Sequence, residues 1–243
     1  MIIKDIYGNF LKDYYAGNKD IQVLLHNHYG PAEDMPVEIF FRKEEYIPDI
    51  EVFALNLCKG KILDIGAGTG GHCLLLQKFG FDVTAIEISA GACEVMKMRG
   101  VEKIINQDLM TFEGQKFDTL LLMMNGIGFC QYEDNLVPFL NHAKKLLKPN
   151  GQIIFDSSDV AYLYDDEPPE EGSYYGEVDY QYEYNGDKGE WFSWLYADAK
   201  LMARVAKKAS WQYINSKPIT RHRNYFRYEK DIFSYCSVSF KQC

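Results

Sequence analysis

The sequence is short of proline and of positive charge. Its 243 residues include 8 prolines, and 26 lysines and arginines stand against 35 aspartates and glutamates, a formal net charge of −9. The composition is close to the globular average, which excludes disordered, collagen-like and coiled-coil chains. The acidic balance argues against nucleic acid bound through a broad basic face, because phosphate contacts need clustered lysine and arginine. The length suits one globular domain with a small accessory lobe.

Long apolar runs and paired cysteines are also missing. The longest apolar stretch, around Leu120–Met124, is far shorter than the roughly 20 residues of a membrane helix. The opening Met1–Tyr7 lacks the basic start and apolar run of a signal peptide. The six cysteines form no Cys-x-x-Cys pair and have no zinc-like spacing to a histidine. We therefore expect a soluble, reduced, cytoplasmic protein without a membrane contact.

Two histidines alternate in the N-terminal part. On a strand, His26 and His28 would share one face and, with Glu33 or Asp34, could bind a metal. Surface or hydrogen-bonding roles are commoner for such histidines, so no metal is expected. His28 remains a candidate substrate contact.

The chain divides into regions of different pattern. Residues 1–59 predict helices at 5–15 and 49–57 and are interpreted as an N-terminal helical cap; the rest, 60–243, is interpreted as the main domain. Within 60–160, apolar runs typical of strands alternate with helix-period segments, which implies βαβ units and a doubly wound, mostly parallel α/β sheet. Strands are expected at 61–65, 82–88, 102–106, 117–125 and 152–156, and helices at 72–79, 90–99 and 135–148.

The last third has a different pattern. Strict alternation over 176–184, the turn Asn185–Gly189 and the aromatic run 191–196 predict a β-hairpin inside an insertion at 161–197. A hairpin at this point of the chain lies near the carboxyl ends of the sheet, where open α/β folds bind ligands. Its aromatic residues could form a lid over a substrate or simply the buried face of the hairpin. A helix to Lys208 and closing strands at 211–214 and 232–240 follow.

A glycine-rich stretch carries the strongest functional signal. Gly66, Gly68 and Gly70 follow a buried strand and precede a helix, so the backbone can approach a ligand closely and the helix start can receive a carboxylate or phosphate. With Gly71, the loop also satisfies the dinucleotide pattern G-x-G-x-x-G. The loop alone therefore leaves two cofactors open.

Acidic residues end the next two strands, and the second of them separates the two possible cofactors. Glu87 ends the second strand, where an acid can accept hydrogen bonds from both ribose hydroxyls of either cofactor. Asp108 ends the third strand, where a carboxylate can accept from an exocyclic adenine amine.

With these motifs the sequence resembles the class I S-adenosylmethionine (SAM)-dependent methyltransferases. Asp64–Gly70 is similar to the family's first motif, Glu87 to its ribose-binding acid and Asp108 to its adenine-site acid. Leu147–Gly151 resembles its L-x-P-G-G turn, with Asn150 in place of the first glycine; asparagine adopts left-handed angles readily. Residues 124–128 and 156–159 also resemble an uncharacterised bacterial subgroup.

The resemblance implies a Rossmann-like methyltransferase fold with seven strands, SAM as cofactor and S-adenosylhomocysteine (SAH) as product. The methionine carboxylate would lie by the glycine loop, Asp64 would position that loop or the ligand's amino group, and adenosine would lie between Glu87 and Asp108. The implied cofactor residues are Asp64, Gly66, Ala67, Gly68, Gly70, Glu87, Ile88, Gln107, Asp108, Leu109 and Asn125.

The expected reaction is an in-line methyl transfer to a small molecule, which mainly requires alignment of the acceptor and exclusion of water. No catalytic base stands out. Asn125 could orient a polar group of the substrate or cap a loop, and Asp156 could be a base, a substrate anchor or a structural acceptor. Phe40–Arg42 could lie across the cofactor or pack on the sheet. The basic stretch between Lys217 and Lys230 could be a solvated face or attract an anion.

Other classes of protein stay open. An NAD(P)-dependent oxidoreductase would use Gly71 but would leave Asp108 and the Pro149 turn without a role. A non-catalytic SAM-binding protein would keep the cofactor site alone. The oligomeric state is not indicated by the sequence.

Overall fold

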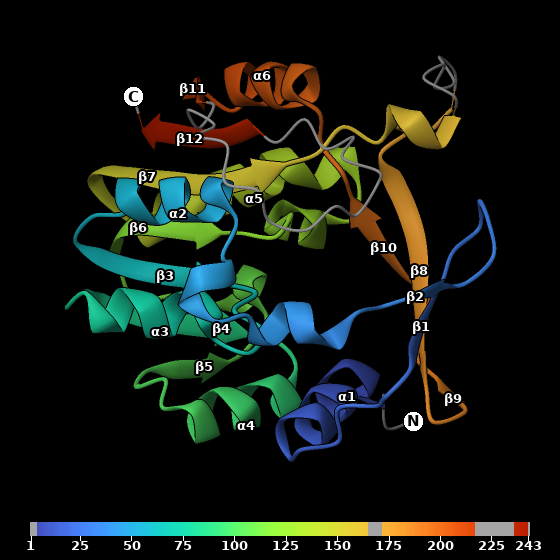
Figure 1. Ribbon diagram of the computed structural model, residues 1–243. Helices are drawn as coiled ribbons and strands as arrows, with labels where there is room; N and C mark the ends of the chain where they lie inside the picture. The colour runs from blue at the N-terminus through green and yellow to red at the C-terminus, as the bar shows by residue number, and fades with distance from the viewer. Residues whose placement is uncertain (1–3, 165–171, 217–235, 243) are drawn as a thin grey trace.

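The computed structural model describes residues 4–164, 172–216 and 236–242. A seven-stranded sheet with the order β11-β12-β7-β6-β3-β4-β5 forms its centre (Figure 1). Strands β5, β4, β3, β6 and β7 pair in parallel, while β12 is antiparallel to both β7 and β11. The predicted doubly wound, mostly parallel sheet is therefore confirmed. The strands are β3 (Lys61–Ile65), β4 (Asp82–Glu87), β5 (Ile104–Asn106), β6 (Phe117–Leu122), β7 (Leu147–Ser157), β11 (Trp211–Ser216) and β12 (Cys236–Gln242).

Helices cover both faces of this sheet. Helices α2 (Asp49–Leu57), α3 (Gly71–Lys78) and α4 (Ala90–Arg99) share one apolar cluster with the sheet, and α5 (Glu133–Leu146) and α6 (Ala199–Lys208) share another. Local chemistry sets the ends of α4. The Ser89 hydroxyl accepts the Ala92 N–H at its start, and Gly100 ends it in the left-handed region at φ 95°. None of the helices in the described ranges is both long and apolar enough to cross a membrane.

A second, smaller sheet stands at the carboxyl edge of the central one (Figure 1); we call it the cap sheet. Its order is β10-β8-β1-β2, with β9 paired to β8. The predicted hairpin supplies three of these strands, and Asn185 and Gly186 make its tight turn with φ angles of 53° and 77°. The strands are β1 (Val23–His26), β2 (Glu33–Asp34), β8 (Glu177–Tyr184), β9 (Asp187–Lys188) and β10 (Phe192–Leu195).

The N-terminal segment is not the wholly helical cap that the sequence predicts. Helix α1 (Ile6–Tyr15) forms as expected, but β1 and β2 follow it, and β1 pairs with β8 of the insertion. Two short 3₁₀ turns, η1 (Val37–Phe41) and η2 (Glu44–Tyr46), then lead to α2. The prediction was wrong for β1 because a four-residue strand whose partner lies far along the chain has no local signature. The two predicted regions therefore share one sheet.

Asp5 joins α1 to α4. Its carboxylate accepts the Gly8 N–H at 2.8 Å, which caps α1, and the Gly91 N–H at 2.9 Å in the first turn of α4. The Ser89 hydroxyl donates to the same carboxylate at 2.8 Å. One negative charge thus lies at the positive ends of two helices, which stabilises both. The helices touch through bare backbone, since a Cβ added at Gly91 would lie 2.7 Å from the Gly8 Cα.

We expect Gly91→Ala to lower the free energy of unfolding by about 1–3 kcal/mol, because the new methyl group would push α1 away from α4. Urea titration followed by circular dichroism measures this change. Gly71→Ala is the matched control, since no atom lies within 4 Å of its added Cβ and it also sits at a helix start. Equal stability of the two variants would contradict the proposed close contact.

Candidate functional site

The glycine loop connects β3 to α3 at the carboxyl edge of the sheet. Gly66, Gly68 and Gly70 all have positive φ angles, 67°, 55° and 77°, which other residues adopt at a cost. A Cβ at Gly70 would lie 2.5 Å from Val101, so this glycine permits packing. At Gly66 nothing lies within 4 Å of an added Cβ, so the backbone there is open to a ligand. Ala67 lies between them, partly buried.

Glu87, the last residue of β4, binds this loop. One carboxylate oxygen accepts the Gly68 N–H at 2.9 Å and the other accepts the Ser89 N–H at 3.0 Å. The side chain is buried, and burial raises the pKa of the Glu87 carboxyl while these N–H groups oppose the rise. A carboxylate has about four acceptor positions, so each oxygen keeps room for a further donor.

The remaining residues of the predicted adenosine site follow β4 and β5. Ile88 is an apolar side chain left 71% exposed directly after Glu87. Asp108 is exposed and accepts the Met110 N–H at 2.8 Å through one oxygen. Gln107 is exposed and donates to Thr111, whereas Leu109 is buried in the core. The structure thus places Ile88, Gln107 and Asp108 at the surface of neighbouring strand ends, beside Glu87.

Tyr7, from α1, is a further candidate site residue, which the sequence did not reveal. A Cβ at Gly68 would lie 3.0 Å from the Tyr7 hydroxyl, so this phenol lies on the glycine loop. Burial raises the pKa of Tyr7 well above its usual value, and the charge of Glu87 raises it further. The ring packs on Phe40 and Tyr182. Tyr7 has no sequence signal of its own, because its position depends on the long-range contact by which Asp5 holds α1 on α4.

The sequence also did not reveal an ion network around the buried Glu51, next to the glycine loop. Glu51 of α2 binds Arg42 through one oxygen and His72 through the other, each at 2.7 Å. Burial acts against these charges, but the partners outweigh it, so the pKa of Glu51 is lowered and the pKa of His72 is raised. Asp64 is buried below the loop, where burial raises its pKa and the Cys73 thiol donates to it at 3.1 Å. Two basic side chains, Arg42 and His72, and two acidic ones, Glu51 and Asp64, therefore lie around the start of α3.

Asn125 and Asp156 come together at the ends of β6 and β7. The Asn125 backbone N–H donates to Asp156 at 2.7 Å, and the Asn125 amide donates to the Leu195 carbonyl of β10 at 3.2 Å. Asn125 is 9% exposed and has a left-handed φ of 57°. Its Oδ1 is buried and has no hydrogen-bond partner among the described residues. Such an atom is costly to bury, which makes it a candidate ligand contact.

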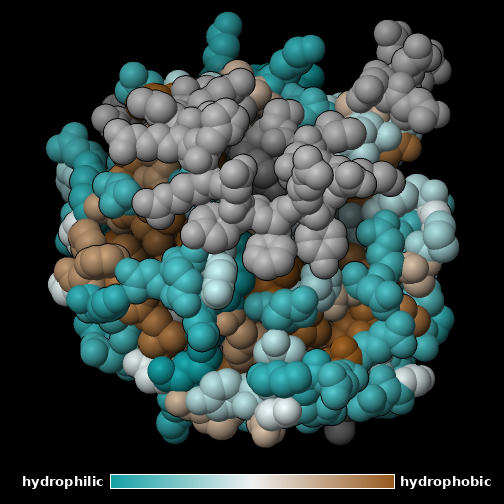
Figure 2. All heavy atoms as spheres, viewed as in Figure 1, coloured by the Kyte–Doolittle hydropathy of each residue, from teal (hydrophilic) through white to brown (hydrophobic). Residues whose placement is uncertain are grey.

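The cap sheet and its loops carry a group of tyrosines, of which Tyr196 directly follows the Leu195 that Asn125 binds. The hydroxyls of Tyr29, Tyr180 and Tyr196 form a chain with O···O distances of 3.2 Å and 3.1 Å. The sheet is held on the central domain by Trp194, whose indole fills the space that a Cβ at Gly128 would take. Figure 2 shows apolar residues at the surface between the two sheets, with hydrophilic residues below and to the right of them.

Other predicted residues have structural neighbours instead. His28 stacks on Trp191 with ring centroids 4.2 Å apart, and no contact in the described part of the chain joins it to Asn125 or Asp156. His26 binds Glu183 at 2.7 Å. Phe40 packs on Tyr7 of α1, in the apolar cluster around that helix, instead of in the predicted contact with the central sheet. Residues 217–230 lie outside the described residues.

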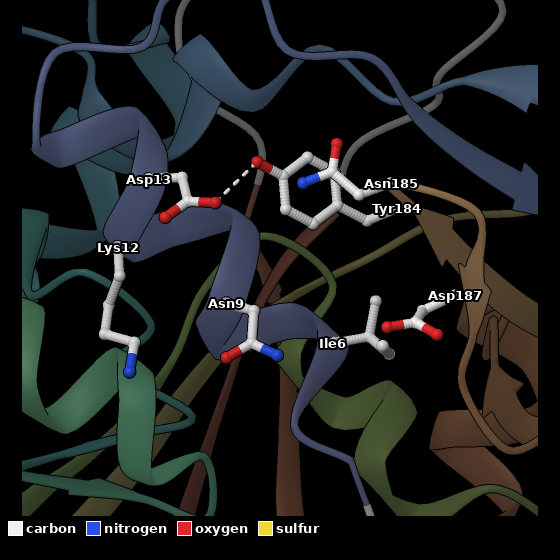
Figure 3. A pocket seen from close by; sticks show the side chains of 7 residues that line it. All are labelled: Ile6, Asn9, Lys12, Asp13, Tyr184, Asn185 and Asp187. Atoms are coloured by element: carbon white, nitrogen blue, oxygen red, sulfur yellow. Dashed lines mark hydrogen bonds between the residues drawn. The ribbon is translucent and has the colours of Figure 1, made fainter.

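Two further features of the described residues concern metal binding and a surface cavity. Within residues 4–164, 172–216 and 236–242, no three histidine, cysteine or acidic side chains gather as a metal site would require. A cavity of about 310 Å³ lies between α1 and the β8–β9 turn, and no residue of the glycine loop lines it (Figure 3). There Tyr184 donates to Asp13 at 2.7 Å, and the lining is mostly polar.

Comparison with known proteins agrees with this architecture. Residues 63–155 match the family model described as a methyltransferase domain. The crystal structure of a SAM-dependent methyltransferase from Bacteroides fragilis in complex with SAH is 32% identical and superposes with a TM-score of 0.82. That similarity covers 98% of this chain and 94% of the other.

Curated relatives match over shorter stretches. The putative methyltransferase YqeM of Bacillus subtilis is 29% identical over 40% of this chain, and the demethylmenaquinone methyltransferase of Tropheryma whipplei is 31% identical over 39%. The chain spans 42% and 40% of the lengths of these two proteins. The similarity to them is therefore confined to part of each chain.

We expect Asp156→Asn to become more stable relative to wild type as the pH rises. Burial raises the pKa of Asp156 to about 6, above its value in the unfolded chain, so ionisation destabilises the folded state as pH rises from about 4 to above 6. Asparagine keeps the acceptor for the Asn125 N–H but cannot ionise. Relative to wild type, the free energy of unfolding of the variant should rise by about 1–3 kcal/mol when the pH is raised from 4.5 to 7.5.

Urea unfolding at the two pH values measures that gain. Asp82→Asn is the control, because Asp82 is exposed and the Lys103 hydrogen bond lowers its pKa, so no such gain is expected. A stability difference between wild type and Asp156→Asn that stays constant with pH would show that Asp156 titrates normally.

Proposed function

Because this chain belongs to the SAM-dependent methyltransferase family, we propose that it transfers a methyl group from SAM to a small-molecule acceptor. The observation that carries the proposal is the contact between Glu87 and the Gly68 N–H beside an open Gly66. The glycine loop and the Glu87 carboxylate thus lie together at the carboxyl edge of the sheet, where open α/β folds bind nucleotides.

The residues present fit this cofactor. Glu87 has acceptor capacity for two ribose hydroxyls, and the exposed Ile88 offers an apolar surface for adenine. Asp108 has one carboxylate oxygen without a donor among the described residues, as an adenine amine requires. The start of α3, with Arg42 and His72 nearby, suits the methionine carboxylate, and Asp64 suits the ammonium. In this proposal Gly66, Ala67, Gly68 and Gly70 border the methionine part.

The chain's part in the reaction is positioning. When bound, SAM supplies an electrophilic methyl carbon on a positively charged sulfur. Tyr7 would cover the glycine loop and exclude water from it, because its phenol already lies against Gly68. Asn125 would orient the acceptor through its unpartnered Oδ1, and Asp156 would fix Asn125 through the 2.7 Å contact to its backbone. Gln107 and Leu109 would shape the adenine end through their backbone.

Two further aspects of the function are part of the proposal. A small acceptor, rather than nucleic acid, is supported by the formal net charge of −9. A cytoplasmic location is supported by the free thiols of Cys58, Cys73, Cys93 and Cys130, which are typical of a reducing compartment.

We expect SAM and SAH to bind to the protein in isothermal titration calorimetry and NAD not to bind. Glu87→Gln should weaken SAH by about 10- to 100-fold, equivalent to roughly 1–3 kcal/mol, because charged hydrogen bonds to the ribose are lost. Glu94→Gln is the control, since Glu94 is an exposed α4 residue paired with Lys12.

Melting curves of both variants separate a binding defect from a folding defect. Saturable NAD binding without heat from SAM would overturn the cofactor assignment. Unchanged SAH affinity in a folded Glu87→Gln protein would show that the ribose does not bind to Glu87.

A further inference from the structure

We propose that the methyl acceptor is an organic amine, bound as a cation between the tyrosine cluster of the cap sheet and Asn125. This tyrosine cluster is defined as Tyr29, Tyr180, Tyr182 and Tyr196. The inference rests on the proposed methyltransferase function and names its substrate class. It is carried by the aromatic surface, by the carboxylates at its two ends and by the orphaned Asn125 oxygen.

The tyrosine cluster runs from the cofactor residues to the protein surface. At the inner end, Tyr182 packs on Tyr7, which lies on Gly68. The hydroxyls of Tyr196, Tyr180 and Tyr29 then continue as a hydrogen-bonded chain. At the outer end Tyr29 is 41% exposed, whereas Tyr180 is 7% exposed. An acceptor approaching the glycine loop along this path would pass successive aromatic rings.

Carboxylates act on both ends of the tyrosine cluster. Burial raises the pKa of Tyr29 and of Tyr196, the latter to about 12, and the charge of Glu33 on β2 raises both further. At the inner end Glu87 acts in the same way on Tyr7 and, with burial, on Tyr182. Two cations of neighbouring segments are themselves paired with acids, since Arg42 binds Glu51 and Lys188 binds Glu183. The field along the cluster therefore attracts a cation and repels an anion.

Aromatic faces and acids together are the chemistry that recognises ammonium groups. A cation is attracted to the electron-rich face of an aromatic ring, most strongly where water is excluded. Phenol oxygens and the Asn125 Oδ1 accept hydrogen bonds from N–H donors. The Asn125 amide is held against β10 by its bond to the Leu195 carbonyl, next to Tyr196. In the proposal, its buried oxygen, which has no partner among the described residues, accepts the ammonium N–H.

The chemical step balances with the groups present. The ammonium gives one proton to the Asp156 carboxylate, which lies beside Asn125, and so frees its lone pair. The nitrogen then forms a bond to the methyl carbon of SAM while the carbon–sulfur bond breaks. The electron pair of that bond stays on the sulfur of SAH, and the methylated nitrogen carries the positive charge.

Binding of three probes with the same ring tests the proposal: benzylammonium, benzyl alcohol and benzoate, each titrated at pH 7 into SAH-saturated protein. Saturation with SAH is measured first, so failure of the cofactor site is detected separately from failure of the amine assignment. Benzylammonium should bind about tenfold tighter than either other probe. Equal or tighter binding of the alcohol or of benzoate, or no binding of benzylammonium, would overturn the assignment.

Two variant pairs locate the cation. Glu33→Gln should weaken benzylammonium about three- to tenfold, whereas Asp34→Asn should not, because adjacent strand residues face opposite sides and Glu33 is the β2 acid that acts on Tyr29 and Tyr196. Tyr196→Phe should weaken it similarly, whereas Tyr184→Phe should not. Tyr184 lies on the same face of β8 as Tyr180 and Tyr182, but its hydroxyl donates to Asp13 of α1 (Figure 3). SAH affinity should be unchanged in all four. Equal effects within each pair would contradict binding at the cluster.

Discussion

The bond between the Glu87 carboxylate and the Gly68 N–H is the contact on which the site depends. It joins the end of β4 to the loop after β3, and the second Glu87 oxygen holds Ser89 at the start of α4. A buried carboxylate is tolerated there only because N–H groups receive it. The same geometry leaves acceptor positions free for a ligand. One side chain thus fixes the loop, starts a helix and faces the proposed ribose position.

The cap over this edge is assembled from remote parts of the chain. Asp5 binds α1 to the start of α4, β1 pairs with β8, and Trp194 fits against Gly128. Each contact crosses a long sequence separation, so the cap depends on the finished central sheet. Its aromatic inner face and the acids Glu33 and Glu87 give the proposed acceptor site its character.

Features with a local signature could be predicted from the sequence. The pattern and capping residues placed α4 at Ala90–Arg99. Asn150 has the expected left-handed φ of 62°, although it lies within β7 and not in a turn before that strand. The glycine loop and Glu87 lie together as their positions after β3 and in β4 imply. Tyr7 and the Glu51–His72 pair could not be predicted, because their roles come from tertiary contacts that leave no periodic signal. Strand β1 escaped prediction for the same reason.

A crystal structure of the protein with SAH tests the central claim most directly. The account predicts that both ribose hydroxyls donate to the Glu87 carboxylate, that adenine lies against Ile88 with its amine on Asp108, and that the methionine carboxylate faces Gly66 and the start of α3. SAH bound anywhere else, or with its ribose away from Glu87, would contradict it.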